Sequence, residues 1–279
     1  MGELADCLRK CIEARAHELA VSEDLQRLTQ KAYYNAVVKG AKRKELFRRI
    51  LPVAKVNSYR MKIVTSDADG YASKKALKAE VPYMHPKYTS SDVVIERAWT
   101  VPLAPKELIE DGEFDVIENE VRIAGEQLEN TLNRDALSTL IDNAGSEETA
   151  AADFSDVLST TASALADIGD SNFVPTHIIA CPTFYFSFMQ RTRQPFTRGL
   201  DLRLLSITSN GTKTWGWSSS GDVGAMALDA SAAALILMRE DITVKKYSDP
   251  LADLRGAIVS MKYKVAIRKP KAICIIKRA

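Results

Sequence analysis

Histidine and cysteine are scarce in this 279-residue chain, which contains three histidines and four cysteines. Catalysis at neutral pH draws mainly on His, Cys or paired carboxylates whose pKa is shifted. His17, His85 and His177 lie far apart in the sequence, and we interpret each as structural. Cys7 and Cys11 are one helical turn apart, but no second pair with zinc-like spacing follows, so core packing is the preferred interpretation. We therefore predict no enzyme activity, no catalytic residues, no cofactor and no metal site.

Glycine-rich phosphate loops are absent as well. Neither G-x-x-x-x-G-K-[ST] nor G-x-G-x-x-G occurs, which leaves nucleotide hydrolysis and dinucleotide redox chemistry without support. The serines at 218–220 form no G-x-S-x-G elbow and are interpreted as a loop. Apolar runs such as 232–238 are too short to span a bilayer, and no basic segment followed by an apolar one opens the chain. We expect a soluble protein, with no membrane partner, whose cysteines suit a reducing cytoplasm.

A strong charge of one sign is also lacking, because 38 Lys and Arg nearly balance 36 Asp and Glu. The distribution is uneven, however. The net charge is +7 for residues 1–62, 0 for 63–105, −8 for 106–142, −4 for 143–238 and +7 for 239–279. This polarity along the chain indicates subunits that meet head to tail or a polyanionic partner, unless the charges pair within the fold.

Two helices and a basic stretch are predicted before Pro52. Apolar residues recur at helical spacing over 3–20, and a second helix is expected from Ser22 through Ala36, with Gly40 as its stop. The basic stretch contains five cations, Lys42, Arg43, Lys44, Arg48 and Arg49. Clustered cations bind a nucleic-acid backbone without reading bases, although an amphipathic helix docked on an acidic neighbour explains them equally well.

From Val53 the pattern changes to β-prone runs at 60–65 and 92–101, which predict a long β-hairpin. Its tip region is polar and includes Lys74, Lys75 and Lys78. Such a hairpin has few side chains with which to build its own core. We therefore expect it to project from the body of the protein and to need a neighbour.

The strongest periodicity follows Pro105 and the acidic run 107–113. Apolar residues recur at steps of three and four from Ile117 to Ile141, and they predict one helix from about Phe114 to Asn143. At about 1.5 Å per residue this helix would extend roughly 45 Å. Its acidic residues gather in the first turns, where carboxylates favour the positive end of the helix dipole.

The remaining sequence alternates helices and strands, which indicates a mixed α/β layer. A helix capped by Asp153 is expected to end at Gly169, and a strand at 176–181 precedes a helix that begins at Pro182. Asn210-Gly211 lies between the β-prone runs 202–208 and 212–217 and predicts a hairpin. Further strands are expected after Met238, at 257–266 and at 272–276.

This order of elements resembles the major capsid proteins of tailed double-stranded DNA viruses, the Hong Kong 97-type capsid fold that encapsulins share. The resemblance is carried by the hairpin at 55–99, by the run Val101-Pro102-Leu103-Ala104-Pro105 into the helix at 118–142, and by the ending at 230–276. Within that ending it rests on the strand, loop and strand at 235–244, 247–250 and 261–266.

The resemblance implies an α+β chain with four parts. These are a helical basic N-terminal arm at 1–52, an extended hairpin or E-loop at 53–104, a peripheral domain with the spine helix at 105–145 and 236–279, and an axial domain at 146–235. It implies that the chain assembles with itself into hexamers and pentamers of an icosahedral shell enclosing double-stranded DNA, as part of a virion assembled in the host cytoplasm. The basic cluster would face the lumen or DNA, and the three hairpin lysines would lie between subunits.

Some members of this family crosslink a hairpin Lys to an Asn near the C-terminal end. Lys74, Lys75 and Lys78 are available, but the last Asn of the chain is Asn210, in the expected axial domain, so we predict no crosslink. Only about 50 residues precede the hairpin, which implies a separate scaffold protein or none. Portal and decoration proteins are further partners that the resemblance suggests.

Two alternatives to a viral capsid stay open at this point. An encapsulin shell around a cargo enzyme has the same fold, and Leu4, Leu8 and Ile12 resemble its hydrophobic cargo-peptide site. A protein with a basic arm that binds nucleic acid without forming shells belongs to a different class. The basic cluster at 42–49 favours DNA as the packaged material.

Overall fold

The computed structural model describes residues 31–67, 87–105, 114–191, 202–208, 212, 214–249 and 254–279. The chain divides into two compact units, which are described separately. The first unit comprises Met1–Glu45, Arg97–Asn130 and Glu240–Met261, and the second comprises Leu46–Glu96, Thr131–Arg239 and Lys262–Ala279. The predicted helix at 3–20 and the Ser22 helix start lie outside the described residues. Helix α4 (Phe114–Asp142) and strands β10 (Ala234–Asp249) and β11 (Leu254–Ile267) pass from one unit into the other.

The long helix α4 confirms the prediction from apolar spacing, since it has 29 residues. In the first unit its buried residues Val121, Ala124 and Leu128 form one stripe, as the sequence predicted. In the second unit the stripe continues with Leu132, Leu137 and Leu140, which are among the most deeply buried side chains. Asn143 donates its side-chain amide to the carbonyl of Thr139 at 2.9 Å, which satisfies a carbonyl near the end of the helix.

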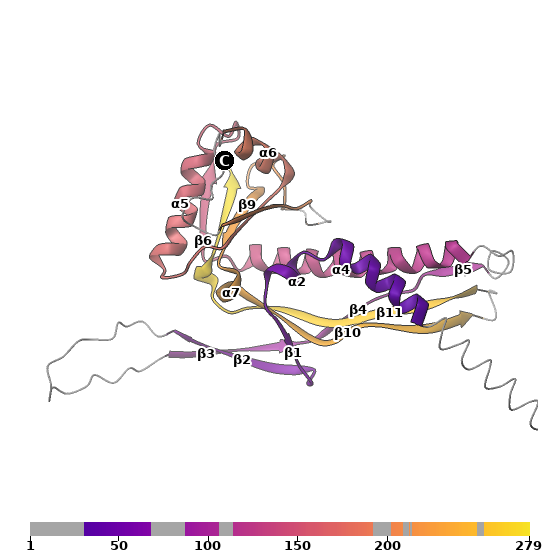
Figure 1. The fold of residues 1–279 in the computed structure, drawn as a ribbon. Coiled ribbons are helices and arrows are strands. Elements are labelled where there is room, and N and C mark those ends of the chain that lie inside the picture. The colour runs from indigo at the N-terminus through magenta and orange to yellow at the C-terminus, as the bar shows by residue number, and fades with distance from the viewer. Residues whose placement is uncertain are drawn as a thin grey trace, which may run out of the picture. The chain divides into compact units, whose positions relative to one another are not determined.

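A helix at 31–44 crosses α4 in the first unit at a pair of glycines (Figure 1). A Cβ placed on Gly40 would overlap the carbonyl oxygen of Arg122, and one on Gly125 would overlap that of Val37. The two backbones are therefore in direct contact. The expectation that Gly40 stops this helix is wrong, because the residue serves close packing and the helix continues to Lys44.

The described strands between residues 53 and 105 belong to two sheets. The first sheet has the order β1-β10-β11-β4, with β5 paired to β11. Its shorter strands are β1 (Val53–Lys55), β4 (Glu96–Thr100) and β5 (Leu103–Pro105). The hairpin itself is confirmed as an antiparallel pair of β2 (Arg60–Asp67) and β3 (Lys87–Val94), in register from Arg60↔Val94 to Asp67↔Lys87. The predicted run at 92–101 is divided, since Ile95 separates β3 from β4.

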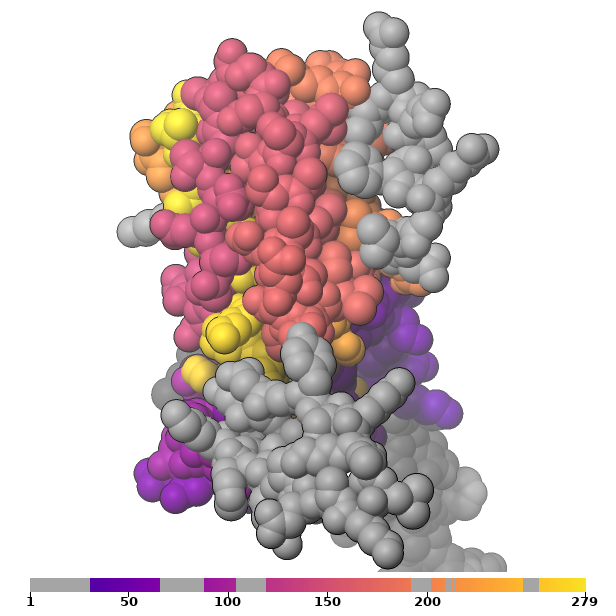
Figure 2. All heavy atoms as spheres, turned by 90° about the vertical axis from the view of Figure 1, so that its left-hand side faces the viewer, coloured from indigo at the N-terminus to yellow at the C-terminus, as the bar shows by residue number. Residues whose placement is uncertain are grey.

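The second unit contains a five-stranded sheet of order β6-β12-β9-β7-β8. Its strands are β6 (Ser146–Ala150), β7 (His177–Ala180), β8 (Arg203–Ser206), β9 (Val223–Leu228) and β12 (Ile273–Arg278). Helix α5 (Val157–Asp170) packs on β6, β12 and β9, and α6 (Pro182–Arg191) packs on β8 and β9. Figure 2 shows α5 as a salmon column beside the pink residues that include β6. The mixed α/β layer and the helix starting at Pro182 are thus confirmed.

Three local predictions in this unit are corrected. Residues 202–208 and 212–217 form no hairpin among the described residues, because β8 pairs in parallel with β7 and Trp215 bridges to Val223. Helix α5 begins at Val157 and not near Asp153, whose carboxylate accepts the amide of Ser155 at 3.0 Å in a turn, and it runs past Gly169 to Asp170. The strand expected after Met238 begins earlier, since β10 starts at Ala234, directly after the short helix α7 (Ala230–Ala233) that the Asp229 carboxylate caps.

Two further short helical elements lie in the second unit. Helix α2 (Phe47–Ile50) lies within the basic stretch, and the 3-10 helix η1 (Pro270–Ala272) leads into β12. Strand β12 pairs in parallel with β6 and antiparallel with β9. The end of the chain therefore completes the sheet of the second unit.

Candidate functional surfaces

The five cations of the predicted basic cluster belong to two separate structural settings. Lys42, Arg43 and Lys44 are exposed at the end of the helix at 31–44, in the first unit. Arg43 donates to the carboxylate of Glu126 at 3.2 Å, and Glu126 also accepts from Arg122 at 2.8 Å. The acidic side of α4 therefore neutralises part of the basic arm. An exposed pair of this kind contributes at most about 1 kcal/mol and weakens with salt.

Arg48 and Arg49 are carried by α2 in the second unit. The helix is anchored by Phe47, whose side chain is fully buried and whose amide donates to the side-chain oxygen of Asn133 at 3.3 Å. Arg49 is exposed and Arg48 is half-buried. A buried anchor thus holds a cationic surface in a fixed orientation. The role of all five residues toward DNA or the lumen stays a prediction.

The hairpin of β2 and β3 has two chemically different faces. On one face Met61 lies opposite Val93 and Ile63 opposite Ser91. Val93 belongs to a buried apolar cluster with Val56, Ile95, Leu237 and Ala266, against which Ile63 packs. This cluster joins the base of the hairpin to the rest of the second unit.

The opposite face of the hairpin exposes apolar side chains to solvent. Val64 is 59% exposed, Tyr88 69% and Val94 50%. The register places all three on the face that also carries Lys62 opposite Asp92. A two-stranded sheet is marginally stable by itself, and fully burying an apolar side chain contributes about 1.5–3 kcal/mol. The geometry therefore fits a hairpin that gains stability from a neighbouring surface. Lys74, Lys75 and Lys78 lie outside the described residues.

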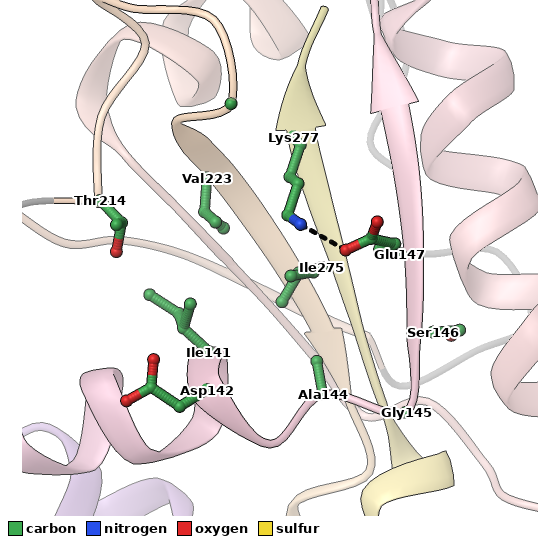
Figure 3. Close-up of a pocket in the computed structure, with 11 residues that line it drawn as sticks. Ile141, Asp142, Ala144, Gly145, Ser146, Glu147, Thr214, Val223, Ile275 and Lys277 are labelled. Atoms are coloured by element: carbon green, nitrogen blue, oxygen red, sulfur yellow. Dashed lines mark hydrogen bonds and ion pairs between the residues drawn. The ribbon is translucent and has the colours of Figure 1, made fainter.

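A cavity of about 590 Å³ lies in the second unit where α4 ends (Figure 3). Lys277 forms an ion pair with Glu147 across neighbouring strands, and Asp142 accepts the hydroxyl of Ser138 at 3.2 Å. The lining contains neither histidine nor cysteine. The exposed ion pair is a weak contact in water. The cavity therefore offers polar contacts but no nucleophile paired with a base.

An aromatic cluster rigidifies the second unit beside α5. Phe154 stacks on Trp217 with ring centroids 4.8 Å apart, and Phe184 meets Trp217 edge to face at 5.4 Å. Phe154 has φ of 60°, a left-handed conformation that costs an aromatic residue about 1–3 kcal/mol. Arg191 holds this turn by donating to the carbonyls of Asp153 and Ser155. No sequence pattern predicted this cluster, because its members come together only in the tertiary fold.

Titratable groups of the described residues show no catalytic arrangement. Burial lowers the pKa of His177, with a further contribution from Arg203. Burial raises the pKa of the Cys181 thiol and raises that of Cys274 to about 11. Both cysteines are free and buried, so they are neutral thiols at pH 7. Within the described ranges no group of three His, Cys, Asp or Glu is placed to hold a metal ion, and no helix has the length and apolarity to cross a membrane.

The fold is similar to solved structures of viral particles. A structure from Microbacterium phage Oxtober96 is 15% identical and covers 84% of this chain and 91% of its own, with a TM-score of 0.63. The mature capsid of bacteriophage PhiM1 is 11% identical, with coverages of 84% and 87% and a TM-score of 0.63. A virus-like particle from Pyrococcus furiosus is 14% identical, with coverages of 87% and 96% and a TM-score of 0.64.

Neither a family model nor a curated protein matches the sequence. The likeness is therefore one of structure. It extends over most of this chain and of each solved chain. The chain has the Hong Kong 97-type capsid fold.

Proposed function

We propose that this protein is the major capsid protein of a tailed double-stranded DNA virus or provirus and assembles with copies of itself into an icosahedral shell. The single observation that carries the proposal is the likeness of fold to phage capsid structures over 84% of the chain. Fold alone does not specify function. The exposed face of the hairpin supplies a physical reason for self-association.

The hairpin supports assembly because it exposes three apolar side chains on one side of a two-stranded sheet. Isolated apolar residues are common on protein surfaces, but three exposed on one face of a two-stranded sheet, together with the charged pair Lys62 and Asp92, fit an interface. In the proposed shell this face lies against a neighbouring subunit. Val64, Tyr88 and Val94 would then be buried. The hairpin would be stabilised by this contact as well as by the apolar cluster at its base.

The proposal includes partners and a location. Hexamers and pentamers of the chain would enclose double-stranded DNA, which the basic residues at 42–49 would contact without reading sequence. Scaffold, portal and decoration proteins are proposed as further partners, with assembly in the host cytoplasm and the virion as the final location. The sequence-based division into arm, E-loop, peripheral domain and axial domain is retained as a proposal for the parts of each subunit.

A second function, an encapsulin shell around a cargo enzyme, stays open because encapsulins share this capsid fold and a virus-like particle is among the similar structures. The virus-like particle from Pyrococcus furiosus matches this chain with a TM-score of 0.64 and with coverage of 96% of its own length. Nuclease treatment of purified particles separates the two functions. A capsid is expected to protect long double-stranded DNA from digestion, whereas a compartment is expected to contain protein cargo and little DNA.

The proposed hairpin interface is tested by adding one charge to either face. Tyr88 and Thr89 are neighbours on β3, both are exposed, and their side chains lie on opposite faces. We expect Tyr88→Asp to reduce the assembled fraction in size-exclusion chromatography and Thr89→Asp to leave it near wild type. Equal assembly by both variants would contradict the proposed role of this face.

A further inference from the structure

A second cavity in the second unit is lined by two cations and an apolar floor. It has a volume of about 310 Å³ and lies between the hairpin and α7. Its apolar floor comes from Ile63, Val64, Phe173 and Ala232, and its polar lining from Thr65, Ser231, Arg268 and Lys269. Among the residues that the structure describes, no carboxylate lines it. The volume equals about ten water molecules at about 30 Å³ each, which suits a few side chains of a peptide.

Arg268 is the exposed cation of this groove. Its guanidinium donates to the carbonyl of Ser231 at 3.2 Å, a neutral acceptor. Within the described part of the chain no carboxylate forms an ion pair with it. The backbone amide of Arg268 is fixed by the carbonyl of Ala233 at 2.9 Å, so the side chain starts from a rigid position. The groove is therefore preorganised for an anionic group beside an apolar one.

The chain itself contains a segment of matching chemistry. Residues 107–113 read Glu-Leu-Ile-Glu-Asp-Gly-Glu, with four carboxylates around an adjacent Leu and Ile. It lies in the most acidic part of the sequence, residues 106–142, whose net charge is −8. Its structure lies outside the described residues. Its carboxylates match Arg268 and Lys269, and Leu108 and Ile109 match the apolar floor.

We propose that the acidic segment 107–113 of a second copy docks in this groove, with its carboxylates on Arg268 and Lys269. The inference rests on the proposed shell function and names one of the contacts that hold subunits together. The groove adjoins the hairpin, since Ile63, Val64 and Thr65 of β2 line it. The apolar floor favours this peptide over a sugar-phosphate backbone, which has no apolar side chains to bury.

Charge reversal in the full-length protein tests the contact. We expect Arg268→Glu to raise the protein concentration needed for assembly by at least about tenfold, because like charges then face each other. Lys271→Glu is the matched control, because Lys271 is exposed on η1 and does not line the groove. Equal behaviour of the two variants would overturn the inference while leaving the shell function intact.

Rescue identifies the occupant and shows whether it comes from another copy. Arg268→Glu and the double variant Glu110→Lys/Asp111→Lys are each expected to assemble poorly, and a mixture of the two is expected to assemble well because unlike subunits make matched contacts. A mixture that stays defective would overturn docking between copies. Loss of packaged DNA in Arg268→Glu particles that assemble at the wild-type concentration would also overturn the inference and assign the groove to nucleic acid.

A peptide measurement is independent of shell formation. A labelled synthetic peptide of residues 105–114 is expected to bind unassembled wild-type protein and to bind Arg268→Glu at least about tenfold more weakly, as measured by fluorescence anisotropy. Circular dichroism of the variant verifies that it is folded. Equal affinity for both folded proteins would overturn the inference even if the protein forms shells.

Discussion

The crossing of the helix at 31–44 with α4 predicts opposite effects for the same substitution at two glycines. Gly125 lies at the crossing, where a Cβ would overlap the carbonyl oxygen of Val37 and lie 3.0 Å from its carbonyl carbon. Gly169 lies in the last turn of α5, where a Cβ would meet nothing within 4 Å. Both residues are helical, so an alanine gains up to about 1 kcal/mol of helix propensity at either position.

Only Gly125→Ala also creates a steric conflict. The atoms in its way are backbone, so one helix must move as a whole, away from a contact that buries Ala36, Val37 and Ala41. Overpacking of a close-packed site costs about 1–3 kcal/mol. The upper part of this range applies because backbone atoms cannot move aside individually, and subtracting about 1 kcal/mol of helix propensity leaves a net loss of about 1–2 kcal/mol for Gly125→Ala. Gly169→Ala is expected to gain up to about 1 kcal/mol.

Urea unfolding of the unassembled subunit measures both free energies. Limited proteolysis adds a local readout, since a displaced helix at 31–44 is expected to be cut sooner in Gly125→Ala. Gly40→Ala is expected to resemble Gly125→Ala, and the double variant is expected to cost less than the sum because both residues serve one contact. A Gly125→Ala protein as stable as wild type, with unchanged proteolysis, would refute the close backbone contact.

Three further predictions concern the second unit. Gly224→Ala is expected to destabilise the subunit by about 1–3 kcal/mol, because a Cβ there would overlap the Trp217 ring, and near-UV circular dichroism would report the disturbed indole. Tyr263→Phe is expected to lower the free energy of unfolding in urea by about 1–2 kcal/mol, because the Tyr263 hydroxyl donates a hydrogen bond to the Asp135 carboxylate at 2.7 Å. An unchanged free energy of unfolding would contradict a stabilising role for this bond. The pKa of Cys274 is raised to about 11 in the folded protein, so the folded state keeps this thiol neutral at pH values where the unfolded chain loses the proton. The free energy of unfolding is therefore expected to fall as pH rises from about 9 to 11. A smaller fall in Cys274→Ala measures this contribution, and an identical fall would contradict it.

Local periodicity predicted the helices and strands whose apolar residues follow one period. The stripe from Val121 to Leu140 specifies α4 because each member faces the same side of a helix. Pro182 marks the start of α6 because its fixed φ suits the first helical turn. These features depend on neighbours in sequence, so they can be read without the tertiary fold.

Features that depend on distant residues were missed or misinterpreted. Gly40 looks like a stop signal, but its function depends on Arg122, 82 positions away, which sequence spacing does not show. The Asn210-Gly211 pair suggested a hairpin, yet β8 obtains its hydrogen bonds from β7 in parallel. The groove joins residues from β2, Phe173, α7 and the two residues that follow β11. The acidic segment could be noted from sequence, whereas its proposed partner surface required the fold.

The proposed function requires that this chain form closed shells from copies of itself. Electron microscopy of the purified full-length protein under assembly conditions shows whether such shells form. We predict closed particles of uniform size, with the β2–β3 hairpin of each subunit lying against its neighbour in a reconstruction. A protein that stays monomeric across protein concentration and ionic strength, with no particles in the images, would contradict the account.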